Sequence, residues 1–169
     1  MIKAQDIVIA LGLLLKEGHE TYANLGRDLG ISASETHASV RRLQESRLVD
    51  PDSLHVRRPA LLEFLVHGVP YVFPAKLKEV TRGVPTAWAA PVLREQFAAG
   101  DQLPPVWSHP DGTVQGAAVQ PLYPSVPRAA QKTPGLYDLL ALVDALRLGR
   151  ARERSLAEAE LTKRVNAHA

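Results

Sequence analysis

The chain contains no cysteine, which excludes disulfide bonds and thiolate metal sites. It also has little excess of charge, since 20 basic and 18 acidic side chains leave a net charge of +2 over 169 residues. Residues 1–58 carry eight basic and eight acidic side chains, so this part has no general positive field. The hydrophobic share of 46% and the charged share of 22% are those of an ordinary folded protein.

Long hydrophobic runs are also missing. The apolar segment 7–15 is too short to span a bilayer, has Asp6 on its amino side and is followed by no small-residue cleavage site. We therefore expect a buried helix, a cytoplasmic protein and no contact with a membrane.

Motifs of catalysis and cofactor binding are absent as well. The sequence has no phosphate-binding loop, dinucleotide fingerprint or nucleophile elbow, and its six histidines show no metal-ligand spacing. These absences predict a protein that is not an enzyme and that has no catalytic residues, no metal and no cofactor.

The first predicted helix, residues 4–17, ends at Gly18 and is apolar on nearly every face. Such a helix must be covered on more than one side. The helices that follow it provide one cover, and the other is either a later part of the chain or a second subunit. A pair of helices near the carboxy terminus is the best candidate for this second cover.

Residues 21–49 carry the strongest signal in the sequence. Thr21 is placed to cap a helix over residues 22–29, and Gly30 ends that helix because glycine accepts a positive φ. Ser32 is placed to cap the next helix, residues 33–46. Helical spacing turns four of its side chains inward, namely Thr36, Ser39, Val40 and Leu43.

This pattern of two capped helices and a glycine turn, followed by Leu48 and Val49, resembles the winged helix-turn-helix regulators of bacteria, of the MarR and Lrp-like kind. The matching residues make up about a sixth of the chain. The resemblance implies a homodimer that binds a palindromic site in duplex DNA and regulates transcription, with the helix at 33–46 in the major groove.

The outward side of this helix supplies the expected DNA contacts. Arginine makes bidentate contacts to guanine, glutamate accepts a hydrogen bond from cytosine, and small residues permit close approach to the bases. The predicted contacts are Ser32, Ser34, Glu35, His37, Ala38, Arg41 and Arg42.

Beyond residue 49 the prolines begin, and the predictions become less regular. We expect a turn at 50–53, a helix at 59–67, a short strand at 71–74 and a wing within residues 71–88. The basic residues of this wing, Lys76, Lys78 and Arg82, are expected to meet phosphate groups. A hairpin that turns at Pro110 and Gly112 is expected to join residues 106–107 to 114–119.

The carboxy end returns to helical patterning. Thr133 and Pro134 begin a helix of about fifteen residues. Its apolar face is formed by Leu136, Leu139, Leu140, Val143 and Leu146. Gly149 ends it, and a more polar helix follows from Arg150 to about Val165. Four arginines, Arg147, Arg150, Arg152 and Arg154, are interpreted as part of a solvated face, and the alternative is a second patch that contacts phosphate groups.

The sequence thus predicts a mainly α protein: a winged helix-turn-helix with small β-hairpins and a carboxy-terminal helical extension. We divide it into a DNA-binding domain at 1–90 and a domain at 91–169 for dimerisation or partner binding. The alternative function is an antitoxin or adaptor that binds a partner protein and regulates its own operon. Residues 122–127 resemble a segment of helix-turn-helix proteins encoded beside nucleotidyltransferase-like toxins.

Overall fold

The structure is a computed structural model that describes residues 1–98 and 100–167. The helices in its amino-terminal half are α1 (Ala4–Leu15), α2 (Tyr22–Leu29), α3 (Ala33–Glu45), α4 (Arg58–His67) and α5 (Val69–Val72). The strands are β1 (Val80–Pro85), β2 (Pro105–Ser108) and β3 (Val114–Ala118), and short 3-10 turns lie at Ala87–Ala89 and Arg94–Gln96. The chain ends with α6 (Val126–Lys132), α7 (Pro134–Leu148) and α8 (Ala151–Ala167).

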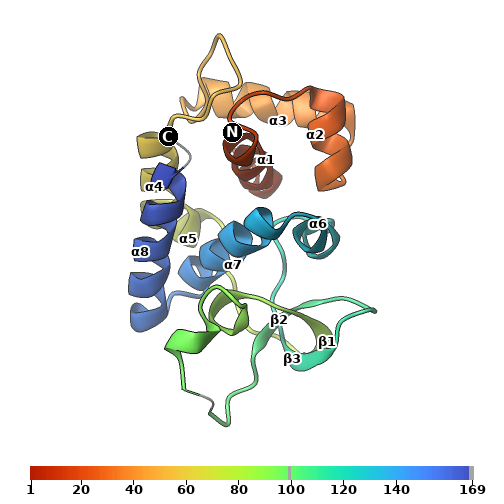
Figure 1. Ribbon diagram of the computed structural model, residues 1–169, viewed down its shortest axis with the longest axis vertical. Helices are drawn as coiled ribbons and strands as arrows, with labels where there is room; N and C mark the ends of the chain where they lie inside the picture. The colour runs from red at the N-terminus through yellow and green to blue at the C-terminus, as the bar shows by residue number, and fades with distance from the viewer. Residues whose placement is uncertain (99, 168–169) are drawn as a thin grey trace.

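Helix α1 lies between α3 and α7. Figure 1 shows α2 and α3 at one end of the long axis, the strands at the other, and α7 between α1 and the strands. Every side chain from Ile7 to Leu13 is fully buried, because α2 and α3 pack on one side of α1 and α7 packs on another. A later part of the chain is therefore the second cover of α1, and this helix needs no second subunit to bury it.

The carboxy-terminal helices follow the sequence pattern closely. Helix α7 begins at Pro134, and all five predicted core positions on it are buried. Gly149 ends the helix with a φ of 81°, a left-handed conformation that glycine adopts without strain. Helix α8 then packs against α4 and α7. The buried side chains of all these helices belong to one core cluster, and the proposed division at residue 90 remains a prediction.

The predicted hairpin at 106–119 is wrong in its pairing, although both of its strands exist. β2 and β3 run parallel to each other, and each pairs antiparallel with β1. Gly83 of β1 is opposite both Ser108 and Val114, so the connection between β2 and β3 crosses β1 at this point. A Cβ on Gly112 would lie 2.4 Å from the Gly83 backbone, which shows why glycine is needed at the crossing.

The strand expected at 71–74 is also wrong, because Val69–Val72 form the helical turn α5. Pro70 lies in the first turn of α5, where its missing N–H costs no hydrogen bond, and Val69 and Pro70 are buried. Residues 71–88 accordingly hold the end of a helical turn and one strand, and no wing hairpin forms within them. The first helix is shorter than predicted, ending at Leu15, while the fourth begins one residue early at Arg58.

A buried polar network attaches the strands to α7. The Asp144 carboxylate, 2% exposed, accepts hydrogen bonds from Thr86 Oγ1, Trp107 Nε1 and Arg147 Nη1, each 2.7 Å long. Arg147 also donates to the carbonyl oxygens of Phe73 and Gln120. Arg147 is thus a buried structural residue, contrary to the expectation of a solvated arginine face.

Candidate nucleic-acid interface

The connection between α2 and α3 is a tight turn with a cap on each helix. Thr21 Oγ1 accepts a hydrogen bond from the Asn24 N–H, and Ser32 Oγ accepts one from the Glu35 N–H, at 3.1 and 3.2 Å. Gly30 has a φ of 69°, as the sequence predicted, and the Ile31 N–H donates to the Gly26 carbonyl. Both caps and the turn residue are confirmed, as are the four inward positions of α3, all of them buried.

Gly26 lets α2 pack tightly against the turn and the first part of α3. A Cβ at this position would lie 2.4 Å from the Ile31 carbonyl oxygen and 2.8 Å from Thr36 Oγ1, so only glycine fits. The Thr36 hydroxyl beneath it is fully buried and has no hydrogen-bond partner among the described residues. A buried hydroxyl without a partner costs roughly 1–3 kcal/mol.

Replacement of Thr36 by valine is therefore expected to raise the free energy of unfolding by about 1 kcal/mol, because a methyl group takes the place of an unpaired hydroxyl. Urea denaturation followed by circular dichroism measures the change. Thr21→Val is the matched control, since it removes a hydroxyl that caps α2 and should cost about 1 kcal/mol. A loss of stability in Thr36→Val would show that the hydroxyl has a partner.

Helix α3 is fixed to α1 by a second ionic network. Arg42 donates through Nε and Nη2 to the two carboxylate oxygens of Asp6, both at 2.8 Å, and Asp6 is fully buried. Arg42 Nη2 also lies 2.9 Å from Glu35 Oε1 and 3.0 Å from Ser39 Oγ, and the Gln5 amide donates to Glu35. These hydrogen bonds, chiefly those to Asp6, raise the pKa of Arg42 above its usual value.

Arg42 is thus committed to α1, and its side chain is only 16% exposed. Arg41, the next residue, is exposed and has no hydrogen bond or ion pair among the described residues. The structure therefore separates two arginines that the sequence treats alike. Arg41 is available to a ligand, whereas Arg42 positions α3.

The open side of α3, here called the outer face, contains most of the other predicted contact residues. Ser34 and His37 are exposed, Ala38 is half-buried, and the exposed Ser32 lies at the amino end of the helix. The His37 ring contacts the ring of Tyr22 edge-on, with 5.0 Å between ring centroids. The outer face therefore lies on the side of α3 that adjoins the amino end of α2.

A short antiparallel hairpin follows α3 directly. Val49 pairs with Val56, and the Asp50 and Arg57 N–H groups donate to the carbonyl oxygens of His55 and Leu48. The side-chain amide of Gln44, on α3, donates to three carbonyl oxygens of the loop, those of Asp50, Pro51 and Ser53. Figure 1 shows this loop projecting from the same end of the molecule as α3. The segment expected to be a simple turn is therefore a small projecting hairpin.

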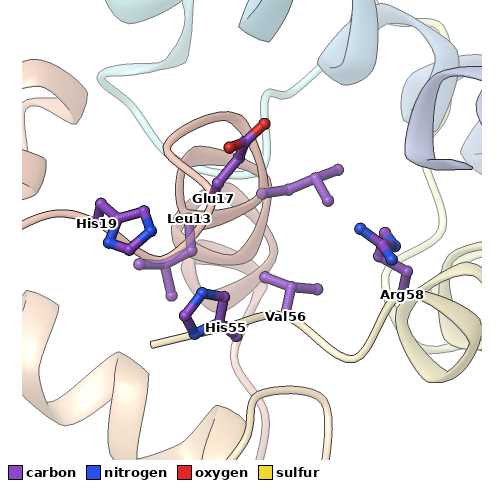
Figure 2. A pocket seen from close by; sticks show the side chains of 7 residues that line it. Leu13, Glu17, His19, His55, Val56 and Arg58 are labelled. Carbon is purple, nitrogen blue, oxygen red and sulfur yellow. The ribbon is translucent and has the colours of Figure 1, made fainter. Parts of the chain in front are cut away.

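A cavity of about 210 Å³ lies where the far arm of this hairpin meets the end of α1. Figure 2 shows His19 and His55 side by side on one wall, with Arg58 on the opposite side and the Glu17 carboxylate directed away from the rings. The two imidazoles meet edge-on at 5.5 Å between centroids, and Gly18 packs against His55. These contacts hold the hairpin against α1. In the part of the chain that the structure describes, no group of three or more residues is suited to a metal ion.

The three cations expected on a wing lie elsewhere. Lys76, Lys78 and Arg82 are exposed, and they belong to the segment that leads into and through β1. Figure 1 places β1 at the opposite end of the long axis from α3. Lys78 Nζ donates to Gln120 Oε1. The structure thus does not bring these three residues next to the outer face of α3.

Sequence reasoning missed the residues that hold the interface in shape. Asp6 stands in an apolar helix, where a lone buried carboxylate signals a buried cation nearby, and Arg42 is that cation. Gln44 gave no such signal, because its contacts depend on the path of the loop after α3.

Comparisons with known protein families, with curated proteins and with solved structures found no match to this chain. Within residues 1–98 and 100–167, no helix is both long enough and apolar enough to cross a membrane.

Proposed function

We propose that the protein is a sequence-specific DNA-binding transcriptional regulator in which α2 and α3 act as a helix-turn-helix and α3 enters the major groove. The observation that carries the proposal is the outer face of α3, where an unpartnered arginine projects from a helix that is capped at Ser32 and fixed to α1 by Asp6. A rigid helix with small residues at its amino end fits the geometry of major-groove contacts.

Few exposed cations lie near α3, as expected of a protein that binds DNA through a small number of charged side chains. Arg41 supplies a positive group on the outer face, and two arginines later in the chain, Arg47 and Arg57, are exposed as well. Arg57 lies 3.9 Å from Asp50, an ion pair between exposed groups that a phosphate would readily replace. Under this proposal the hairpin after α3 takes the position of a wing, and Ser32, Ser34 and His37 contact the DNA beside Arg41.

Arg41→Ala is expected to weaken binding to the operator by about 1–3 kcal/mol, the usual cost of losing a bidentate contact to a base. The measurement is fluorescence anisotropy with the DNA upstream of the protein's own gene, repeated over a series of salt concentrations. The unfolding curve should remain unchanged, because the exposed Arg41 side chain makes no hydrogen bond or ion pair among the described residues.

Arg94→Ala is the matched control, since Arg94 is also exposed but belongs to the turn at Arg94–Gln96, far from α3 in Figure 1. It should bind DNA as the unchanged protein does. If Arg41→Ala bound as tightly as Arg94→Ala, α3 would not be the helix that reads DNA.

The alternative function, an antitoxin or adaptor for a partner protein, is favoured by a different observation. Large apolar side chains are exposed along the segment from α5 to β1, namely Tyr71 (71% exposed), Val72 (57%), Leu77 (41%) and Val80 (52%). Exposed apolar side chains close together often mark a protein interface. The same surface is a candidate for the expected homodimer, because α1 is already covered by α7.

Light scattering tests whether the apolar segment forms a homodimer, and co-purification tests whether it binds a partner protein. A homodimer through this surface is expected to dissociate in a Tyr71→Ser, Val72→Ser double variant. An adaptor is expected to lose the product of the neighbouring gene from the same preparation. A double variant that kept its oligomeric state and its partner would assign no interface to this segment.

A further inference from the structure

A basic crevice lies at the carboxy end of α2, on a part of the surface that the proposed DNA contacts do not use. It has a volume of about 30 Å³, and its walls are the last turn of α2 and one side of α6. Arg27 projects into it from α2, and Arg128 and Lys132, one helical turn apart, project from α6.

These three cations have no hydrogen bond or ion pair within the described residues. The acid in the described lining is Asp28, whose carboxylate is 3.7 Å from Lys16 Nζ and so already has a cationic neighbour. Glu20 is a second acid near Arg27, but the three cations still outnumber the one acid in the lining. An excess of cations at a concave site raises the local potential and attracts anions. The crevice is open to solvent, and its volume of about 30 Å³ is close to that of one water molecule, so a charged group enters it in part and otherwise lies at its mouth.

A larger groove of about 590 Å³ opens directly beside the crevice and shares Gly30, Ser125 and Arg128 with it. Its other walls are the Tyr123 ring, several prolines, and the polar side chains of Ser108 and His109. The volume is typical of sites for small organic molecules, which combine an apolar wall with a few polar groups.

We propose that the crevice and the groove together bind a small organic anion, whose phosphate or carboxylate group lies among Arg27, Arg128 and Lys132 and whose apolar body lies against Tyr123. Such a group forms charge-assisted hydrogen bonds to the two arginines and the lysine. The Ser125 and Ser108 hydroxyls are in the same lining, but Ser125 Oγ donates to the Leu29 carbonyl and Ser108 Oγ lies 3.2 Å from Thr81 Oγ1, so the three cations supply the main polar contacts to the ligand.

The phosphate groups of DNA are the alternative ligand for these three cations. The contact between Tyr22 and His37 places the outer face of α3 at the amino end of α2, whereas the crevice lies at its carboxy end. An eight-residue helix is about 12 Å long. The crevice therefore lies about that far from the contact between Tyr22 and His37. Ser32 at the start of α3 is nearer, two residues after Gly30 of the crevice lining, so DNA binding by the variants described below decides between the two ligands.

The position of the site also connects it to α3. Ser125 Oγ donates a 2.6 Å hydrogen bond to the Leu29 carbonyl, and Ser125 packs against Gly30, the residue at which the chain turns from α2 towards α3. An anion held between α2 and α6 favours one arrangement of this turn, so it changes the affinity of α3 for DNA. This last step rests on the proposed function, whereas anion binding itself does not.

Isothermal titration calorimetry of the full chain without DNA tests the site. The probes are phenyl phosphate, phenylacetate, inorganic phosphate and the neutral benzyl alcohol. We expect at least one aromatic anion to bind about tenfold more tightly than both inorganic phosphate and benzyl alcohol, because it alone uses both the cations and Tyr123. The preferred aromatic anion identifies the acidic group. Failure of both aromatic anions to exceed the other two probes would overturn the proposal.

The double variant Arg128→Gln, Lys132→Gln is expected to lose about tenfold or more of that affinity. Lys76→Gln, Lys163→Gln is the matched control, because it removes two exposed charges away from the crevice and should bind as the unchanged protein does. Thermal unfolding without a probe checks that both variants fold. Equal affinity in all three proteins would overturn the assignment of the cations.

DNA binding by the same variants shows whether the three cations bind DNA phosphates or a small anion. It also tests whether the anion changes the affinity of α3 for DNA. Without a probe, Arg128→Gln, Lys132→Gln should bind the operator with unchanged salt dependence. A reduced salt slope would assign these cations to DNA phosphates and overturn the proposal. The preferred anion should change operator affinity in the unchanged protein and not in this variant. No change would overturn the coupling step, and the calorimetry would still decide the site.

Discussion

Replacement of Arg42 by alanine is expected to lower the free energy of unfolding by about 3 kcal/mol, although Arg42 lies on the helix proposed to read DNA. The substitution leaves the fully buried carboxylate of Asp6 without its cation. It also releases Glu35 and Ser39 from the guanidinium. Urea denaturation followed by circular dichroism at pH 7 measures the loss.

Arg41→Ala is the matched control for this experiment, because it removes the same side chain from the neighbouring position on α3. Its stability should stay within about 0.5 kcal/mol of the unchanged protein, as is usual for exposed positions. A double-mutant cycle with Asp6→Ala should show a coupling energy between Asp6 and Arg42 of about 1 kcal/mol or more. Equal stability of the two arginine variants would show that the Asp6–Arg42 pair contributes nothing.

Asp144→Ala is expected to cost about 3–5 kcal/mol of stability, enough to unfold many domains of this size. Three buried donors lose their acceptor at once: the Thr86 hydroxyl, the Trp107 indole and the Arg147 guanidinium, which is itself only 7% exposed. Thermal and urea unfolding measure the loss. The Trp107 indole should also change its fluorescence, because its hydrogen bond to the carboxylate is broken.

Asp138→Ala tests the same change of residue on the same helix. Asp138 is half-buried and pairs with Arg164 at 3.0 Å near the surface, so its removal should cost no more than about 1 kcal/mol. If Asp144→Ala were as stable as Asp138→Ala, the buried network would not be what holds the strands to α7. If Asp144→Ala does not fold, the milder Asp144→Asn, which keeps one acceptor oxygen, should fold with reduced stability.

Local signals in the sequence were enough to predict the helices near the outer face. Thr21, Gly30 and Ser32 act within a few residues of their own position, through caps and a positive φ, so their effect does not depend on the rest of the fold. The inward positions of α3 and α7 follow from helical spacing for the same reason.

The predictions of secondary structure were wrong where contacts between distant segments override a local pattern. The segment at 71–74 has the composition of a strand, yet α5 packs against α4 and α7 as a helical turn. The two strands after residue 104 have a good hairpin turn between them, yet both pair with β1, and the chain crosses β1 at Gly83. Neither the helical turn nor the strand pairing can be predicted from the residues of the segment alone.

In the candidate site too, features set by the local sequence were predictable and features set by distant contacts were not. The exposed positions of α3 were predictable from helical spacing, but the separate roles of Arg41 and Arg42 were not. Their difference arises from Asp6, which is 36 residues away from Arg42 in the sequence. The basic crevice was equally hidden, because Arg27 and Arg128 are brought together only by the packing of α2 on α6.

The burial of α1 on both sides limits how the chain can be shortened and which substitutions it can accept. A fragment that ended before α7 would present the apolar side of α1 to water, so the helices proposed to face DNA cannot be cut from the chain as an independent module. A substitution beneath α7 also affects the base of α3 through α1, because α1 packs against both helices. Changes in either half of the chain will therefore be constrained by the other.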